Sequence, residues 1–184
     1  MNFINYYRMK NFLVALSFIS CLSISAKLFA HTDSTKVIES MNFSVTDVNG
    51  DETNFKNFLG KGPLLVNFWA LWCEPCKQEM KAFMTLSEKL KEKGVSMVSI
   101  NEDMVKSIAK VRAWVKSKGI TQPMLVDPDG NISRDHFSME SLPYSLLLRP
   151  DGTVYKKHIG FTAGDEVAIE KELDEMLESL SDKK

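Results

Sequence analysis

Cysteine is scarce in this chain, with only three cysteines in 184 residues. Small exported domains that depend on disulfides carry several well-separated cysteine pairs, so this count excludes a disulfide-stapled scaffold. Neither charge sign dominates, because 23 Lys and Arg oppose 24 Asp and Glu, and no long basic run or basic-aromatic cluster indicates binding to nucleic acid. The remaining composition, 44% hydrophobic and 26% charged, is that of a globular protein, and one domain is the simplest expectation.

Acidic residues are missing from the first part of the chain, where no Asp or Glu precedes Asp33. Arg8 and Lys10 come first, residues 11–20 then form an apolar core, and small residues follow. This order of basic, apolar and small-residue regions is typical of a secretory signal peptide. We therefore predict that residues 1–30 direct export and are removed from the mature protein.

Two cleavage sites fit the small-residue region, since a cut after Ala26 or after Ala30 leaves a small residue at the cleaved end. Lipidation of Cys21 is a less favoured alternative, because residues 18–21 form a poor but recognisable lipoprotein-type cleavage site. An uncleaved membrane anchor is another, although a spanning helix needs ~20 apolar residues and the apolar run weakens at residues 23–27. Residues 31–41 are polar, and we expect a flexible lead-in there.

Residues 42–181 carry the alternating pattern expected of one α/β domain. A first β-hairpin is indicated by apolar-polar alternation on both sides of the turn at Asn49-Gly50. Short apolar runs rich in β-formers then alternate with segments whose apolar residues recur at helical spacing, which implies parallel βαβ packing. The expected strands are 64–70, 95–100, 123–127, 144–149 and 153–160, the last two joined into an antiparallel hairpin, and the expected helices are 75–93, 105–118, 131–139 and 165–180.

Cys73 and Cys76 are separated by two residues and stand between the predicted strand 64–70 and the helix that begins at Pro75. Free N–H groups and the positive dipole end at the start of a helix stabilise a thiolate, and Cys-X-X-Cys thiols have pKa values lowered to ~3.5–7.5. Pro75 fits because a residue in the first turn needs no N–H for the helix hydrogen bonds. The pattern predicts that the outer sulfur, Cys73, is a nucleophile at neutral pH.

Three other uses of the cysteine pair have to be weighed. A zinc site needs about four ligands, but the histidines are scattered and none stands at a ligand spacing: His31, His136 and His158. An inert structural disulfide is compatible with export, although so short a loop removes little chain entropy. A copper(I)-binding or delivery module is the alternative function, because two thiolates can bind copper(I), although no Met-rich or His-rich entry tract is present.

The residues around the cysteines also carry a family resemblance. The segment Val66–Glu79, with the sequence VNFWALWCEPCKQE, and the later Leu142-Pro143 before a strand and a PDG hairpin resemble the thioredoxin superfamily, and in particular its exported TlpA/ResA-like branch. The resemblance covers residues 42–180. It implies a thioredoxin-like α/β fold, with a central mixed β-sheet flanked by helices, an N-terminal β-hairpin and a central αβ insertion at residues 103–127.

The resemblance assigns roles to the cysteines and to one proline. Cys73 matches the family's attacking cysteine and Cys76 its resolving cysteine. Pro143 matches a cis-proline that packs against the disulfide and exposes the backbone of Leu142, so that a substrate chain can pair with it as an added strand. From the residues alone we would expect a trans proline, because only ~5–6% of X-Pro bonds in folded proteins are cis.

Glu79 and Asn67 match family positions close to the cysteines. Glu79 follows Cys76 by three residues, one turn along the same helix face, and matches an acidic residue of TlpA/ResA-like reductases. A partly buried carboxylate there would raise the thiol pKa by like-charge repulsion and could take the proton of Cys76; the alternative is a solvated surface glutamate. Asn67 stands where thioredoxin has a buried proton-transferring aspartate, a task that an amide cannot perform.

Further residues are expected along the substrate groove. Trp72 is expected to border it as an apolar platform, and Glu74 to be exposed and to tune the local field or the choice of substrate. Tyr144 and Ser145 replace a pair of threonines found in many relatives, and we expect their side chains beside the groove. The expected substrate-binding residues are Trp72, Glu74, Pro75, Leu142, Pro143 and Tyr144, and the expected catalytic residues are Cys73, Cys76 and Glu79.

The resemblance implies an extracytoplasmic thiol–disulfide oxidoreductase, in the periplasm or an equivalent compartment. Glu79 and the Glu-Pro dipeptide favour a protein-disulfide reductase, such as those that serve cytochrome c maturation, because strongly oxidising relatives usually have His in the dipeptide. The expected partners are a disulfide-containing exported protein and a membrane protein that relays electrons. We expect a monomer with no metal and no cofactor other than the redox-active Cys73–Cys76 disulfide.

Overall fold

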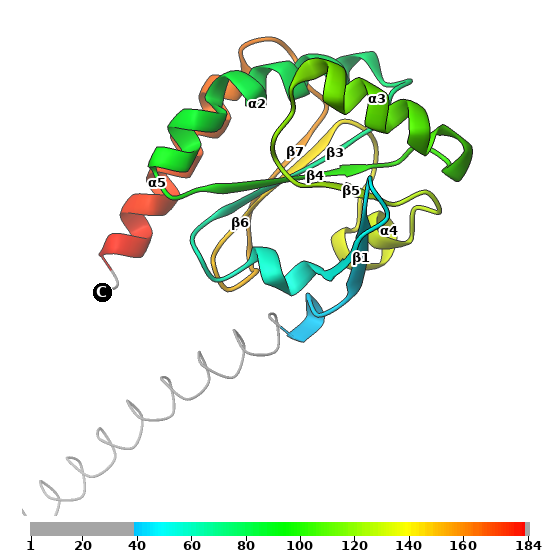
Figure 1. The fold of residues 1–184 in the computed structure, drawn as a ribbon. Coiled ribbons are helices and arrows are strands. Elements are labelled where there is room, and N and C mark those ends of the chain that lie inside the picture. Colours follow the sequence, from blue (N-terminus) through cyan, green and yellow to red (C-terminus); the bar gives the residue numbers. More distant parts are fainter. Residues whose placement is uncertain (1–38, 183–184) are drawn as a thin grey trace, which may run out of the picture. The chain divides into compact units, whose positions relative to one another are not determined.

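The computed structural model describes residues 39–182, so the predicted signal peptide and most of the predicted lead-in lie outside the described residues. The strands form one sheet in the order β2-β1-β5-β4-β3-β6-β7 (Figure 1). They are β1 (Ser44–Asp47), β2 (Glu52–Asn54), β3 (Leu64–Trp69), β4 (Ser96–Asn101), β5 (Met124–Val126), β6 (Tyr144–Leu148) and β7 (Val154–Ile159). The helical elements are η1 (Phe55–Phe58), α2 (Glu74–Glu92), η2 (Val105–Ser107), α3 (Ile108–Lys118), α4 (Asn131–Phe137) and α5 (Asp165–Ser181).

The sheet is mixed, with its parallel strands in the centre. β3, β4 and β5 run parallel, and β1 and β6 join them in antiparallel pairings that β2 and β7 continue. All six residues of β3 are buried, as expected for a central strand covered on both faces. The predicted N-terminal hairpin forms as β1 and β2, and it extends the main sheet because Thr46 of β1 pairs with Val126 of β5.

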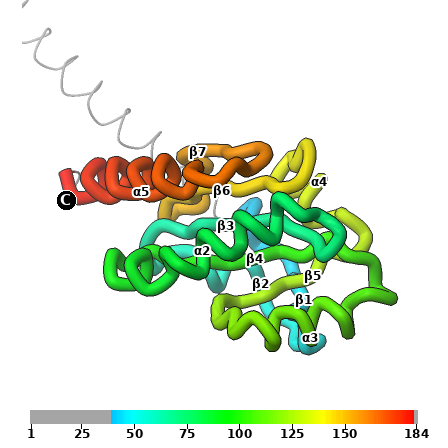
Figure 2. Tube along the Cα trace, turned by 90° about the horizontal axis from the view of Figure 1, so that it is seen from above, coloured from blue at the N-terminus to red at the C-terminus, as the bar shows by residue number. Residues whose placement is uncertain are grey.

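Helices cover both faces of the sheet, and each face has its own core. α2, α3 and α5 lie on one face, and α4 with η1 lies on the other (Figures 1 and 2). On the α4 side, Phe137 contacts Phe55 and Phe68 edge-to-face. On the α2 side, Phe83 belongs to a cluster shared with α5, and Met80 to a cluster shared with α3. Burying each such side chain contributes about 1.5–3 kcal/mol, so these clusters hold the helices on the sheet.

α2 carries the cysteine motif at its start. Cys73 is its N-cap, Pro75 stands in its first turn, and Gly94 lies beyond its end with φ +75°, a left-handed conformation that suits glycine. The buried side chains of the helix are Cys76, Glu79, Met80, Phe83 and Leu90. The predicted helix over 75–93 is confirmed, shifted by one residue toward the N-terminus.

The predicted α/β class and the antiparallel hairpin formed by the last two strands are confirmed. One helix begins differently, because residues 105–107 form a short 3-10 turn before α3, and Val105 is 70% exposed instead of lying on the buried face. Among residues 39–182, no helix combines the length and the apolar character that crossing a membrane requires.

Candidate active site

The two cysteines lie where the buried strand β3 leads into α2. Their sulfur atoms are joined in a disulfide, and the Sγ of Cys73 accepts a hydrogen bond from the backbone N–H of Cys76 at 3.3 Å. As the N-cap residue, Cys73 places its sulfur at the positive end of the helix dipole. Cys73 keeps 6% of its surface exposed and Cys76 none. Cys73 is therefore the cysteine that an approaching molecule meets first.

The loop before β6 brings Leu142 and Pro143 to the cysteines. The peptide bond between these two residues is cis. Leu142 packs against the apolar cluster that contains both cysteines, whereas Pro143 is buried and its carbonyl accepts the N–H of Gly160 at 2.9 Å. Residues 142–143 and 73–76, far apart in the sequence, thus lie together at one end of the sheet.

Glu79 is completely buried on α2, one turn after Cys76. Its Oε2 accepts a 2.6 Å hydrogen bond from Nδ2 of Asn67, and its Oε1 accepts a 2.9 Å hydrogen bond from the hydroxyl of Ser145. Burial is the main influence and raises the pKa of Glu79 to about 8; the two hydrogen bonds oppose this rise, and the charge of Asp165 adds to it. The alternative of a solvated surface glutamate is therefore wrong.

The prediction that the side chains of Tyr144 and Ser145 lie beside the groove is wrong, because both are completely buried in β6. Successive side chains of a strand point to opposite faces. Tyr144 faces the α4 side, where its hydroxyl donates a 3.0 Å hydrogen bond to the carbonyl of Phe137. Ser145 faces the α2 side, where its hydroxyl donates a hydrogen bond to Glu79. The sequence does contain a signal for this difference. In a strand that begins at Tyr144, side chains alternate between the two faces, so Tyr144 and Ser145 must point in opposite directions.

The predicted rim residues of the groove lie in solvent. Trp72 is 70% exposed, beside the buried cysteines. Pro75 is also exposed, and the exposed Glu74 forms an ion pair with Lys77 at 2.5 Å. These three exposed residues are within two positions of Cys73 in the sequence, so their side chains are available to a molecule that approaches Cys73.

Two further exposed apolar side chains follow the neighbouring strand β4. Met104 is 63% exposed and Val105 is 70% exposed. The backbone N–H of Leu71 donates a 2.7 Å hydrogen bond to Oδ2 of Asp103, which ties the loop of Trp72 to the segment before Met104. The sequence did not reveal this pair, because Val105 also fits the helical repeat of the segment that follows.

Residues 39–157, more than half of the chain, match the model of the AhpC/TSA family. The chain belongs to the AhpC/TSA family. This AhpC/TSA-family chain is 37% identical over 119 residues to the thiol-disulfide oxidoreductase ResA of Bacillus thuringiensis subsp. konkukian, a match that covers 65% of the chain and 66% of that relative. It therefore spans slightly less than two thirds of the length of that ResA protein. It is also 32% identical over 133 residues to the thioredoxin-like protein YneN of Bacillus subtilis, covering 72% of this chain and 76% of that protein.

Solved structures share the fold. A Chlorobium tepidum protein designated as thiol:disulfide interchange protein DsbE superposes with a TM-score of 0.65 at 24% identity, covering 74% of this chain and 93% of that one. StoA from Bacillus subtilis superposes with a TM-score of 0.55 at 25% identity, covering 68% of this chain and 92% of that one. The predicted thioredoxin-like fold and the resemblance to the ResA-like branch are thereby confirmed.

This AhpC/TSA-family chain holds a second raised-pKa acid that the sequence did not reveal. Glu102, just after β4, accepts a 3.2 Å hydrogen bond from the hydroxyl of Ser133. Desolvation, followed by the charge of Asp127, raises the pKa of Glu102 to about 8. Asp127 itself accepts the backbone N–H groups of Ile132 and Ser133 in α4. The two acids follow the neighbouring parallel strands β4 and β5, so their approach depends on a strand pairing that the sequence does not specify.

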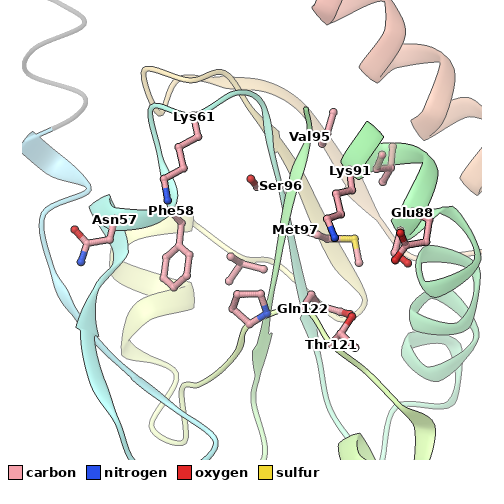
Figure 3. A pocket seen from close by; sticks show the side chains of 14 residues that line it. Asn57, Phe58, Lys61, Glu88, Lys91, Val95, Ser96, Met97, Thr121 and Gln122 are labelled. Carbon is pink, nitrogen blue, oxygen red and sulfur yellow. The ribbon is translucent and has the colours of Figure 1, made fainter. Parts of the chain in front are cut away.

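The structure has a cavity of about 540 Å³ that includes neither cysteine in its lining. Figure 3 shows the side chains that line it. The lining mixes apolar, neutral polar and charged side chains, the charged ones being Lys61, Glu88 and Lys91, and it includes Ser96 at the first residue of β4. Because β4 is parallel to β3, this is the end of the sheet at which β3 begins, whereas Cys73 follows the end at which β3 finishes. None of the predicted site residues lines the cavity. The candidate active site is therefore the cysteine end of the sheet.

Proposed function

We propose that this protein is an extracytoplasmic thiol–disulfide oxidoreductase that reduces disulfides in exported proteins. The observation that carries the proposal is the position of Cys73, at the N-cap of α2, joined to Cys76 and near the cis bond of Pro143. A helix N-terminus favours the thiolate, which is the species that attacks a disulfide. The name thiol-disulfide oxidoreductase, borne by the ResA relatives, supports the same class of reaction.

In the proposed reaction, two electrons pass from the enzyme dithiol to the substrate disulfide. The Cys73 thiolate attacks one substrate sulfur, so a Cys73–substrate disulfide forms and the other substrate sulfur leaves as a thiolate that takes a proton from solvent. Ionised Glu79 then takes the proton of Cys76, whose thiolate attacks the sulfur of Cys73. This step forms the Cys73–Cys76 disulfide and releases the second substrate thiolate, which Glu79 protonates. The substrate becomes a dithiol and the enzyme becomes oxidised.

Glu79 suits the role of proton carrier for two reasons. Burial raises its pKa, and it lies only one turn of α2 after Cys76. With a pKa of about 8, its carboxyl group has nearly the proton affinity of a free cysteine thiol, whose pKa is about 8.5. A proton can therefore pass from thiol to carboxylate and onward at little free-energy cost. A surface glutamate, with a pKa of about 4.3, would hold that proton far too weakly.

The proposed substrate chain pairs with the backbone of Leu142 as an added strand, next to cis Pro143, and contacts Trp72, Glu74 and Pro75 on the rim. Apocytochrome c or another exported cysteine-containing protein is the proposed substrate class. The signal-like sequence of residues 1–30 supports a location outside the cytoplasm. In that oxidising compartment, a membrane protein that relays electrons restores the dithiol. The proposed enzyme is a monomer, and its only redox group is the cysteine pair.

The midpoint potential of the cysteine pair tests the direction of the reaction. Equilibration with glutathione buffers should give a potential well below about −120 mV, the value of a strong periplasmic oxidant. A potential near that value would contradict reduction as the physiological direction. The same protein should reduce insulin disulfides, and Cys73→Ser should not. Stoichiometric retention of copper(I) through gel filtration without any disulfide reduction would favour the metal-binding alternative instead.

A further inference from the structure

We propose that Asn67 and Ser145 are positioning residues for Glu79, which between them supply a hydrogen-bond partner for each of its two protonation states. The proposal rests on the proposed function, in which Glu79 takes the proton of Cys76. It is carried by the contacts of three completely buried side chains. It also gives a reason for an amide at position 67, where thioredoxin has an aspartate.

The sheet places the two partners side by side beneath α2. Asn67 of β3 and Ser145 of β6 are directly opposite each other in the antiparallel register, so both side chains leave the same face of the sheet. Glu79 meets this pair from α2, with its carboxylate 2.6 Å from Nδ2 of Asn67 and 2.9 Å from Oγ of Ser145. Nδ2 of Asn67 also donates a 3.4 Å hydrogen bond to Oγ of Ser145, which closes a ring of three polar side chains.

The charged groups nearest to this ring do not neutralise Glu79. None of the ion pairs found among residues 39–182 includes Glu79. Asp165, at the start of α5, acts on Glu79 as a like charge. His158 of β7 is opposite Ser145 in the register, but its ring is engaged with Glu172 of α5 at 2.8 Å. The ionised form of Glu79 therefore depends on its two neutral donors.

The two protonation states of Glu79 need opposite partners. Ionised Glu79 only accepts hydrogen bonds, and the amide of Asn67 and the hydroxyl of Ser145 donate them. Once Glu79 holds a proton, its O–H needs an acceptor, and Oδ1 of Asn67 is a buried oxygen that has no hydrogen-bond partner. A half-turn of the amide brings this oxygen to Glu79. An ionised aspartate at position 67 could only accept hydrogen bonds, and a leucine could neither donate nor accept.

Ser145 provides a partner that adapts by rotating its hydroxyl. A hydroxyl group donates one hydrogen bond and accepts two, so it serves Glu79 in either protonation state without movement of the backbone. Threonine carries the same hydroxyl on the same carbon, whereas alanine removes it. Ser145→Ala therefore tests the contact, and Ser145→Thr is its matched control.

A titration of Glu79 in the oxidised protein tests the proposal without reference to turnover. The carboxyl infrared band of Glu79, assigned by its loss in Glu79→Gln, is followed against pH in the parent and in each variant. We expect Ser145→Ala and Asn67→Leu each to raise the proton affinity of Glu79 by about threefold to tenfold, because the hydrogen bond that each loses to the charged form is stronger than the one it loses to the protonated form. Ser145→Thr should leave the midpoint within about twofold of the parent.

The pH dependence of mixed-disulfide resolution separates positioning from a merely structural role. In Ser145→Ala and Asn67→Leu the rate profile should move to higher pH together with the carboxyl titration, whereas a structural defect would lower the rate equally at all pH values. If Asn67→Leu does not fold, Asn67→Asp replaces it, and a second acid beside Glu79 should raise its proton affinity by like-charge repulsion.

Unchanged carboxyl midpoints in the folded variants, with normal exchange by the parent protein, would overturn this proposal alone. An absence of disulfide exchange in the parent protein would instead overturn the proposed function, and the positioning role of Asn67 and Ser145 with it.

Discussion

Glu79 and Glu102 reach the same raised pKa, about 8, in different surroundings. Removal from water is the largest cause for both carboxyl groups. Glu79 then meets neutral donors, which favour its charged form, whereas Glu102 faces a second acid, Asp127, whose charge raises its pKa further. Glu79 lies one turn from Cys76 on α2, while Glu102 connects the end of β4 to α4 through the hydroxyl of Ser133.

A raised pKa therefore shows that a carboxyl group is buried or lies near another negative charge, but it does not show what the group does. The function of each acid has to be inferred from the residues that it contacts. Asp127 holds two backbone N–H groups of α4, so the acid pair of Glu102 and Asp127 fastens that helix to the sheet. The partners of Glu79 lie on β3, which leads into Cys73, and on β6. We infer a proton-transfer role for Glu79 and a structural role for Glu102.

The largest expected effect separates the two acids by replacing each with its amide. Glu79→Gln should slow the resolution of the mixed disulfide by about 100-fold or more, because Cys76 loses its proton acceptor. Glu102→Gln is the matched control and should stay within about twofold of the parent rate, since its site is separate. Stopped-flow tryptophan fluorescence with a disulfide peptide measures both rates. An equal loss of resolution rate in the two variants would contradict the assignment of different roles to Glu79 and Glu102.

The stability of the oxidised protein should depend on both acids with the same sign. Each keeps its proton in the folded protein up to a pKa of about 8, but releases it near the ordinary value of 4.5 in the unfolded chain. The folded state therefore binds more protons between these values, so stability is highest below this window and is lost as the pH rises through it.

The slope of this loss is set by the one extra proton that each site holds in the folded protein. Each carboxyl therefore contributes at most about 1.4 kcal/mol per pH unit to the free energy of unfolding. Urea denaturation at several pH values measures the slope, and Glu79→Gln and Glu102→Gln should each flatten it by up to this amount. Stability that increases with pH across this window would contradict both assignments.

Trp72→Ala tests the rim of the site with a smaller expected effect. The exposed indole is proposed to contact the substrate chain, so its loss should raise KM for a protein substrate by about fivefold to tenfold. Reaction with a small disulfide should be unchanged, because the small molecule does not reach the rim. Val154→Ala, which removes an exposed apolar side chain where β7 begins, is the control. An identical rise in KM in both variants would remove the special role of Trp72.

Tyr144→Phe should have the smallest effect and should concern stability alone. It leaves the buried carbonyl of Phe137 without the hydroxyl donor, at a cost of about 1 kcal/mol in the free energy of unfolding. KM and the exchange rate should not change, because the side chain lies in the core on the α4 side of the sheet. A changed KM with unchanged stability would instead indicate that Tyr144 contacts the substrate in the groove.

Patterns that are local in the sequence predicted most of the fold and the centre of the site. The apolar run of β3 and the helical spacing of α2 fix where Cys73 and Cys76 lie, because both patterns follow from burial on a known period. The family resemblance indicated the position of Glu79 beside the cysteines. Asn67 was placed near the cysteines by the same resemblance, but the sequence did not reveal that Asn67 and Ser145 together bond Glu79, because those two residues become neighbours only through the register of β3 with β6.

The remaining failures have the same physical origin. Tyr144 was assigned to the groove from its place next to Pro143, although side-chain alternation in β6 turns it into the core. Glu102 and Asp127 are separated in the sequence by α3 and meet only where β4 and β5 end side by side. Contacts that depend on strand pairing are therefore the part of the site that one sequence does not reveal.

Trapping of the mixed disulfide tests the central claim most directly. Reduced Cys76→Ser and reduced Cys73→Ser are each mixed with a disulfide-containing protein, and the products are analysed by non-reducing electrophoresis and peptide mass spectrometry. Attack by Cys73 followed by resolution by Cys76 predicts that Cys76→Ser accumulates a covalent adduct at Cys73 and that Cys73→Ser accumulates none. Equal adducts in both variants, or none in either, would contradict the account.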